Sequence, residues 1–368
     1  MWKETKVIKN VEYGNFDARY GAYATNETDN KSMLYIASKE FPIKKATRVR
    51  SYDDKVVVQT KGENSLRDTM LFTKDGELLN VVKNIYPLNR NTNLRYMNVL
   101  VNKGENSVSN NNLVDIETGE MIFKDNYPET RFVFGNMIFT NENNIVTRYD
   151  WDGSILWQHN YELDFNVKIN LGFVMEGVCG GKLWVKSDLD WHEILLAIDV
   201  NTGKLIKAFS DSEEDTNLPH CNLGRISNVY LNSENDQILV LTLDKDYGLF
   251  MNFVDAKTLK VLEKRAYAID LDYDNDIENS LGGVTGFQGD YITFWLRRLH
   301  VDSMPSGFAV YNYRKKEVVF AHRLFTPEQT RKGCYLWGNT TQIPFYNNGL
   351  IFVHDNCDTL HIFEDVKE

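Results

Sequence analysis

Residues 270–278 carry the side chains that a calcium-binding loop would need. They read Asp-Leu-Asp-Tyr-Asp-Asn-Asp-Ile-Glu, and carboxylates at alternate positions supply the oxygen ligands that Ca²⁺ prefers. An EF-hand loop also requires Gly at its sixth position and Glu at its twelfth, and this sequence has Ile277 and Gly283 there. We therefore interpret the stretch as a solvated acidic loop, and the sequence predicts no metal site.

The histidines and cysteines do not occur at the spacings of catalytic or metal sites. No HxH or HExxH pair is present, and none of the four cysteines lies in a CxxC pair. His220 and Cys221 are adjacent, but no third group that would orient the histidine as a base can be identified, so we interpret them as ordinary loop. The GxSxG, Walker A and GxGxxG motifs are missing. The sequence therefore predicts no catalytic residue and no cofactor.

Long connections between the predicted strands suggest a site that binds rather than reacts. Connections longer than the chain path requires are more often functional than structural. Four of them cover residues 211–221, 267–281, 299–306 and 326–337, and a shorter one covers residues 187–192. Aromatic anchors beside an acidic rim suit a protein interface. The candidate binding residues are Trp191, His192, Glu213, Asp272, Asp274, Asp276 and Trp337.

An internal repeat supplies the strands that would hold these connections. Its unit is an apolar strand with alternating polarity, a tight turn that contains Asp, and a second apolar strand. The clearest copies span residues 194–206 and 113–122. In the first copy Gly203 follows Asp199 by four residues, where a hairpin turn needs a positive φ at no steric cost. The repeat therefore predicts a series of β-hairpins.

Two more predicted strands precede most hairpins, which makes a unit of four strands. Residues 237–243 and 291–295 are examples of these preceding strands. A repeated four-stranded unit of this size is typical of a β-propeller blade. Looser copies of the hairpin occupy residues 70–79, 145–157, 249–262, 308–319 and 359–363. We therefore predict an all-β propeller of four-stranded antiparallel blades, in one domain over residues 1–368.

The number of blades follows from the number of hairpins. Hairpins fall near residues 34, 71, 113, 146, 196, 250, 309 and 361, which predicts eight blades. Seven is the alternative if the short N-terminal unit is an appendage. The last hairpin lacks its second strand, and residues 5–11 resemble such a strand. We expect this N-terminal strand to complete the last blade and so to remove exposed sheet edges.

The best copies resemble the repeat of PQQ-like propellers, the quinoprotein alcohol dehydrogenase-like group. The matching segments are residues 195–204, 115–120 and 152–157. The resemblance implies the propeller fold, and also a tryptophan that locks each blade to the next. Only Trp157 stands where that tryptophan is expected, so most blades are predicted to lack this tryptophan lock. Quinoprotein enzymes carry two adjacent cysteines beside the quinone. No two cysteines are adjacent in this sequence, so the resemblance is to a non-enzymatic member.

Composition and charge restrict the partners. Apolar residues make up 42% of the sequence and charged residues 25%, which is typical of a globular protein. The net charge of −11 disfavours nucleic acid, since an acidic protein repels phosphate backbones. Residues 1–100 sum to about +5, which leaves about −16 for residues 101–368. The sequence has no apolar run long enough to span a membrane and no export signal at its start, and its cysteines are few, so we expect a cytoplasmic protein.

These observations predict a non-enzymatic propeller that binds a basic protein through the acidic face of its later blades. One concrete version is a cytosolic immunity protein that neutralises a basic toxin. The alternative is a hydrolase or lyase that acts on a small molecule at the mouth of the central channel, or a carbohydrate-binding module there. Such an enzyme would need paired carboxylates or a metal contributed by separate blades.

Overall fold

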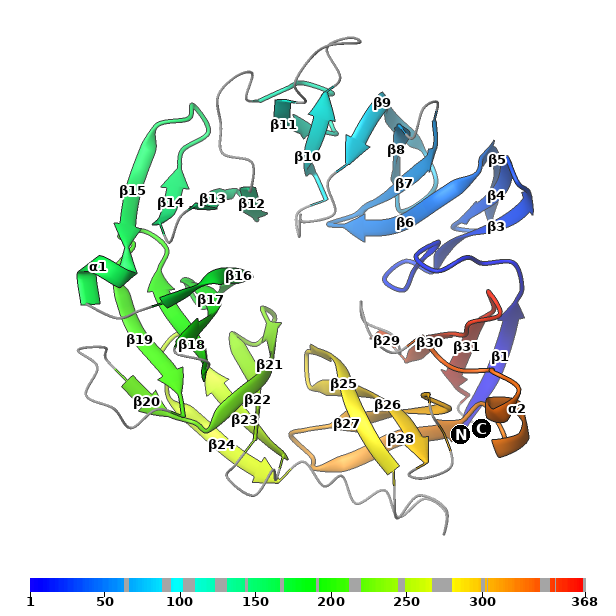
Figure 1. Ribbon diagram of the computed structural model, residues 1–368. Helices are drawn as coiled ribbons and strands as arrows, with labels where there is room; N and C mark the ends of the chain where they lie inside the picture. The colour runs from blue at the N-terminus through cyan, green and yellow to red at the C-terminus, as the bar shows by residue number, and fades with distance from the viewer. Residues whose placement is uncertain are drawn as a thin grey trace. The chain divides into compact units, whose positions relative to one another are not determined.

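The structure is a computed structural model, and its described residues fold almost entirely into strands (Figure 1). The described residues are 1–62, 66–87, 94–101, 110–122, 131–142, 145–165, 169–189, 192–211, 220–243, 249–266, 280–298, 302, 304–337, 345–347 and 349–366. They form seven sheets and two helices of five residues each. The prediction of an all-β structure is confirmed, and five of these seven sheets are four-stranded and antiparallel, as predicted.

The chain forms two compact units. The first unit comprises Met1–Leu88, Leu94–Met121 and Asp270–Glu368, and the second comprises Asn89–Asn93 and Ile122–Ile269. The prediction that residues 1–368 make a single domain stays a prediction. Every helix in the described part of the chain is too short or too polar to cross a bilayer.

The first unit contains four sheets and the helix α2 (Pro327–Arg331). Three of the sheets have four strands, and the fourth has six because β10 pairs briefly with β9 at Val99 and Leu100. Because this pairing joins strands of two predicted blades in one sheet, the sheets do not give the number of blades, which stays a prediction. The sheets are β2 (Phe16–Asp17), β3 (Ala22–Thr28), β4 (Lys31–Ile36) and β5 (Lys39–Lys44); β6 (Ala46–Tyr52), β7 (Lys55–Lys61), β8 (Arg67–Thr73), β9 (Leu78–Pro87), β10 (Tyr96–Val101) and β11 (Asn110–Asp115); β25 (Ser280–Gln288), β26 (Tyr291–Arg298), β27 (Gly307–Asn312) and β28 (Glu317–Arg323); and β29 (Phe345–Asn347), β30 (Leu350–His354), β31 (Leu360–Asp365) and β1 (Trp2–Ile8).

The second unit contains three sheets and the helix α1 (Tyr161–Phe165). Its strands pair in chain order and antiparallel, except that β20 runs parallel to β19. His220 and Cys221 therefore lie in a short strand, and their interpretation as loop is wrong. The sheets are β12 (Arg131–Phe134), β13 (Met137–Glu142), β14 (Ile145–Tyr149) and β15 (Ile155–Asn160); β16 (Ile169–Cys179), β17 (Lys182–Leu189), β18 (His192–Asp199), β19 (Leu205–Ser210) and β20 (His220–Asn222); and β21 (Arg225–Asn232), β22 (Gln237–Leu243), β23 (Leu249–Asp255) and β24 (Val261–Ala266).

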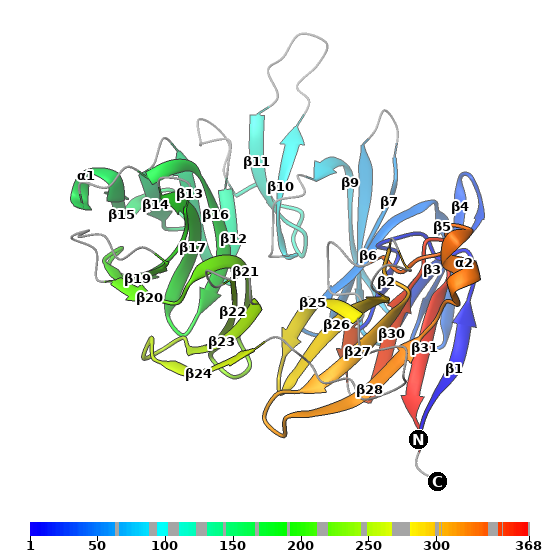
Figure 2. The ribbon, with the colours of Figure 1, turned by 60° about the horizontal axis from the view of Figure 1, so that its bottom comes forward.

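The N-terminal strand completes the last sheet of the first unit. β1 pairs antiparallel with β31, from Trp2 opposite Asp365 to Ile8 opposite Leu360. Both views show β1, in blue, beside β31, in red, with the two ends of the chain close together (Figures 1 and 2). The predicted strand over residues 5–11 is thus correct in its partner, but it begins three residues earlier and ends at Ile8.

The Asp of the repeat shapes the hairpin turn. The Asp199 carboxylate accepts hydrogen bonds from the backbone amides of Asn201 and Thr202, each at 3.0 Å. Such bonds satisfy amides that the two strands leave unpaired. Gly203 then adopts a φ of +70°, as the sequence predicted. The same backbone form persists where the glycine is replaced, since Leu259 and Lys316 have φ of 59° and 61°.

Hydrogen bonds also lock the last strand of one repeat to the hairpin turn of the next repeat. Trp157 of β15 donates from Nε1 to the Val200 carbonyl at 2.8 Å, as the PQQ-like resemblance implies. Asn80 of β9 donates to the Ile116 carbonyl at 3.0 Å, from the position in its repeat that corresponds to Trp157. Lys207 of β19, at the same repeat position, donates to Leu259 at 3.0 Å. That most blades lack the tryptophan lock stays a prediction, and at these two repeat positions an Asn and a Lys side chain stand in place of the indole.

Apolar side chains from neighbouring sheets of each unit pack against one another. In the second unit Trp157 shares a buried cluster with Leu196 of β18. In the first unit Leu34 of β4 shares one with Val58 of β7. Burying a side chain of this size contributes roughly 1.5–3 kcal/mol. Packing between sheets therefore holds the strands of each unit in fixed positions. The ends of these strands in turn fix where each connection starts and ends.

Candidate functional site

Most of the residues predicted to bind a partner lie outside the described residues. His192 is the first residue of β18, opposite Leu189 of β17, so the connection predicted over residues 187–192 shrinks to two residues. Trp337 is the one predicted residue whose side chain the structure describes. The predicted residues outside the described part are Trp191, Glu213, Asp272, Asp274 and Asp276.

Trp337 follows a connection that is ordered by its own helix. Thr326 caps α2 by accepting from the Gln329 amide at 3.3 Å, while the Gln329 side chain accepts from the Thr326 amide at 2.8 Å. This reciprocal pair, with Pro at the start of the helix, is readable in the sequence as Thr-Pro-Glu-Gln. The connection over residues 326–337 was nevertheless interpreted as a loop, and that interpretation is wrong for Pro327–Arg331.

A buried carboxylate fixes α2 to the neighbouring connection. Asp302, whose side chain is fully buried, accepts from the Thr330 hydroxyl at 2.9 Å and from the Ser306 hydroxyl at 2.6 Å. Arg323 donates to the same Ser306 hydroxyl at 2.9 Å and lies 3.7 Å from Asp302. A buried charge is tolerated when it is paired and hydrogen-bonded in this way. The segment that leads to Trp337 is therefore held in one position.

Trp337 forms an aromatic cluster with two tyrosines. Its ring lies 5.4 Å from the ring of Tyr13, which comes from the connection between β1 and β2. It also lies 5.4 Å from Tyr335, in an edge-on arrangement. Tyr13 and Trp337 remain 37% and 36% exposed, which is unusual for large rings already packed on each other. Two connections far apart in the sequence thus present one aromatic surface.

The buried ring of His354 lies next to Tyr13 of this cluster. It is fully buried and lies 6.2 Å from Tyr13. Burial lowers the pKa of His354, so the ring is neutral at neutral pH. Nε2 lies 2.5 Å from the Val11 carbonyl and must donate to it, because a carbonyl only accepts. The histidine therefore ties the chain just before Tyr13 to the end of β30.

Two arginines of β6 lie beside Tyr13. The Val49 amide donates to the Gly14 carbonyl at 2.8 Å, which brings the Tyr13 backbone against the strand. Arg48 and Arg50 flank Val49 and share the opposite face of β6, because successive side chains alternate across a strand. Both are partly exposed, and Tyr13 interacts electrostatically with both. The strand that carries both guanidinium groups is thus joined to the connection that carries Tyr13.

The two guanidiniums are partly desolvated. Burial, together with repulsion from Arg50 and Arg67, lowers the pKa of Arg48 to about 10. Burial also lowers the pKa of Arg50, while Tyr13 and Asp17 act in the opposite direction. Both groups stay cationic at neutral pH, because a guanidinium begins so far above it. A carboxylate from a partner would form charge-assisted hydrogen bonds with a guanidinium at this position.

We call Tyr13, Arg48, Arg50, Tyr335 and Trp337 the aromatic–arginine surface. Aromatic rings and arginines are the side chains that contribute most to binding at protein interfaces. In the described part of the chain, no three His, Cys, Asp or Glu side chains are placed to hold a metal ion. The rings and guanidiniums of this surface are of the types that predominate at protein interfaces.

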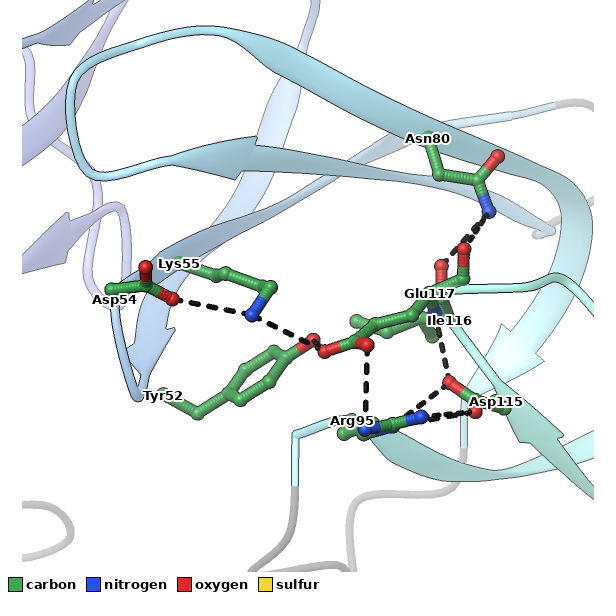
Figure 3. A network of polar contacts seen from close by, with 8 residues as sticks. All are labelled: Tyr52, Asp54, Lys55, Asn80, Arg95, Asp115, Ile116 and Glu117. Atoms are coloured by element: carbon green, nitrogen blue, oxygen red, sulfur yellow. Dashed lines mark hydrogen bonds and ion pairs between the residues drawn. The ribbon is translucent and has the colours of Figure 1, made fainter.

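A second polar cluster joins the β6–β7 turn to the turn after β11 (Figure 3). At its centre Glu117 accepts from the Tyr52 hydroxyl at 3.1 Å and pairs with Lys55 at 3.4 Å and Arg95 at 3.3 Å. Arg95 also forms a two-pronged pair with Asp115, at 2.9 and 3.2 Å. Because its charges neutralise one another, we interpret the cluster as a clamp between strands, not as a site for a ligand.

Comparison with solved structures gives remote likenesses to the whole chain. The β-propeller domain of the Trilobed protease from Pyrococcus furiosus aligns with a TM-score of 0.45 at 11% identity, covering 83% of this chain and 93% of that one. YCF48 from Cyanidioschyzon merolae aligns with a TM-score of 0.42 at 11% identity, covering 99% and 98%. Hsv2 from Kluyvelomyces marxianus aligns with a TM-score of 0.43 at 8% identity, covering 87% and 100%. Likenesses this weak say nothing about what the chain binds.

No protein-family model matches the sequence, and a search of curated proteins finds no match either. Membership of the PQQ-like group therefore stays a prediction.

The sequence interpretation selected Trp337 but missed its neighbours. Tyr13 carries no recognisable motif, since only the pairing of β1 with β31 brings it near residue 337. For Arg48 and Arg50 a signal exists, because the order Arg-Val-Arg inside a strand puts both cations on one face. The acidic runs of the later connections are longer than this basic segment and give a stronger charge signal in the sequence.

Proposed function

We propose that this chain is a non-catalytic β-propeller that binds a protein partner through the aromatic–arginine surface. Successive four-stranded antiparallel sheets and an N-terminal strand that completes the last sheet support the propeller. One observation carries the binding proposal. Tyr13 and Trp337, from separate connections, pack against each other at a tilt yet stay exposed, and the strand that carries Arg48 and Arg50 is hydrogen-bonded to the connection that carries Tyr13.

The rigidity of this surface favours tight binding. The α2 cap and Asp302 hold the segment before Trp337, and His354 holds the chain before Tyr13. Side chains that are already ordered lose little conformational entropy when a partner arrives. Rings of this size bury a large apolar area and are common hot spots. We therefore expect most of the binding energy to come from Trp337 and Tyr13.

Charge defines the partner segment. Arg48 and Arg50 would pair with Asp or Glu side chains, so the docked segment should combine an apolar or aromatic residue with a carboxylate. The opposite polarity, a basic partner, rests on the charge of about −16 in residues 101–368 and on Glu213 and Asp272, which lie outside the described residues. A basic toxin as that partner stays a prediction from charge alone.

A random peptide display library, sorted on the purified full-length protein, tests the proposal. We expect enriched peptides to combine an aromatic or apolar residue with Asp or Glu. Trp337→Ala should weaken them about 30-fold, the equivalent of roughly 2 kcal/mol at a hot spot. Leu163→Ala, at a residue 77% exposed on α1, is the matched control and should leave them unchanged.

Arg50→Glu decides the polarity. It should weaken acidic peptides and strengthen basic ones, because it reverses a charge beside the rings. Enrichment of Lys- and Arg-rich peptides that bind Trp337→Ala as well as the native protein would refute both the surface and its polarity. Melting curves of all variants confirm that a loss of binding is not a loss of fold.

A further inference from the structure

Two of the four free cysteines face each other across a short antiparallel pairing. Cys334 follows α2, and Cys357 lies in the turn between β30 and β31. Leu336 pairs antiparallel with Asp355, and the Asn356 amide donates to the Tyr335 carbonyl at 3.0 Å. In an antiparallel pair one residue number rises as the other falls. This order brings Cys334 near Cys357, which lies in the turn just after the bridge.

The pairing puts the two thiols at a position suited to a disulfide. A backbone hydrogen bond joins Asn356 to Tyr335, and Cys357 and Cys334 are the next residues outward from this contact. A disulfide spans Cα atoms about 4.4–6.8 Å apart, which is a separation between near neighbours. The Cys357 thiol is within hydrogen-bonding reach of Cys334.

Neighbouring contacts already hold both backbones at this spacing. The Asn356 side chain donates to the Gly333 carbonyl at 2.8 Å and accepts from the Tyr335 amide at 2.9 Å. These bonds hold the residues on either side of Cys334 to the residue that precedes Cys357. Oxidation would therefore need little movement of the chain.

We propose that Cys334 and Cys357 form a reversible disulfide that fastens the segment carrying Trp337 to the β30–β31 turn. The inference goes beyond the proposed function and does not depend on it. The oxidant class is a low-molecular-weight disulfide such as oxidised glutathione.

The chemistry proceeds by two exchanges. The Cys357 thiolate, which is exposed, attacks one sulfur of the small disulfide and expels a thiolate, leaving a mixed disulfide on Cys357. Cys334 then loses its proton and attacks the Cys357 sulfur, expelling the second small thiol. Two protein thiols are thereby oxidised to one disulfide, and the oxidant is reduced to two thiols. Burial and the nearby Asp355 raise the pKa of Cys357, so the first step should accelerate as the pH rises.

Oxidation of the full chain by glutathione disulfide, quenched with an alkylating reagent and followed by peptide mass spectrometry, tests the proposal. We expect loss of two of the four thiols and a linked peptide that contains Cys334 and Cys357. Cys179 and Cys221 are the internal control. Cys179 is buried and donates from Sγ to the Asn232 carbonyl at 3.7 Å, so it should be alkylated only after unfolding, whereas partly exposed Cys221 should stay a free thiol that the reagent can alkylate.

Two serine variants test the order of events. Cys334→Ser should keep a stable glutathione adduct on Cys357, because the resolving thiol is gone. Cys357→Ser should react slowly or not at all, because Cys334 is less exposed. Modification of both cysteines as separate adducts in the native chain, or a dimer on a non-reducing gel without the internal link, would overturn the proposal.

Discussion

Replacing Gly203 with alanine tests whether Trp157 acts as a lock between sheets. Gly203 has a φ of +70°, and a Cβ built on it would lie 2.6 Å from atoms of Trp157 and His159. The Gly203 carbonyl also accepts from the Tyr161 hydroxyl at 2.7 Å. Alanine therefore meets two separate penalties at this position, one from its backbone conformation and one from the ring that covers it.

The two penalties can be separated by a matched control in the same sheet. A left-handed conformation costs a non-glycine residue about 1–2 kcal/mol, and overpacking a buried contact adds roughly 1–3 kcal/mol. Gly181 has a φ of +73° but nothing within 4 Å of its Cβ position. We therefore expect the free energy of unfolding to fall by about 1–2 kcal/mol in Gly181→Ala and by about 2–5 kcal/mol in Gly203→Ala.

Urea denaturation followed by circular dichroism measures both losses. A double-mutant cycle with Trp157→Ala then shows whether the ring is the cause, because removing the ring makes room for the new methyl group. The double variant should lose less than the sum of the two single losses. Equal losses for Gly203→Ala and Gly181→Ala, or additivity within about 0.5 kcal/mol, would refute the lock.

Two further predictions concern single residues. His361 bridges Glu4 at 2.7 Å and Asp355 at 3.2 Å, and these carboxylates raise its pKa against the effect of burial. The stability that protonated His361 contributes is complete below its unfolded pKa of about 6.5 and disappears as the pH rises through its folded pKa. The native protein should therefore be more stable than His361→Gln by on the order of 1 kcal/mol at about pH 5, and this difference should close by about pH 9. A difference in denaturation midpoints that stays constant over this pH range would contradict the prediction. Lys316→Gly should raise the free energy of unfolding by about 0.5–1 kcal/mol by relieving its φ of 61°, whereas Lys315→Gly, where φ is not positive, should lower it.

The strands were predictable because the same hairpin pattern recurs eight times along the sequence. Each of the eight predicted hairpins has its first strand in the structure, from β4 at residue 34 to β31 at residue 361. The turn survives even where its signature is lost. Asn312 replaces the repeat Asp and still accepts from the amides of Arg314 and Lys315 at 3.1 and 3.0 Å. Strand periodicity therefore carries more of the fold than the Asp and Gly of the motif.

The hydrogen bonds that lock one repeat to the next were harder to predict because they require a hydrogen-bond donor at one position and not a particular residue type. Trp157, Asn80 and Lys207 have different sizes and charges, but each carries an N–H donor at the same repeat position. The carbonyl that accepts belongs to the next turn, and any donor of sufficient reach can satisfy it. A search for tryptophan alone therefore finds one lock where the described residues hold at least three.

The aromatic–arginine surface could not be read from spacing, because the sheet that joins the two ends of the chain assembles it. Tyr13 and Trp337 are far apart in the sequence, and each lies in a connection with no motif of its own. Once β1 pairs with β31, the Val11 amide donates to Asp358 at 2.9 Å and His354 binds the Val11 carbonyl, which leaves Tyr13 against Trp337. The strand that completes the last sheet therefore also completes the candidate site, so the stability of this edge pairing and the integrity of the surface depend on the same few contacts.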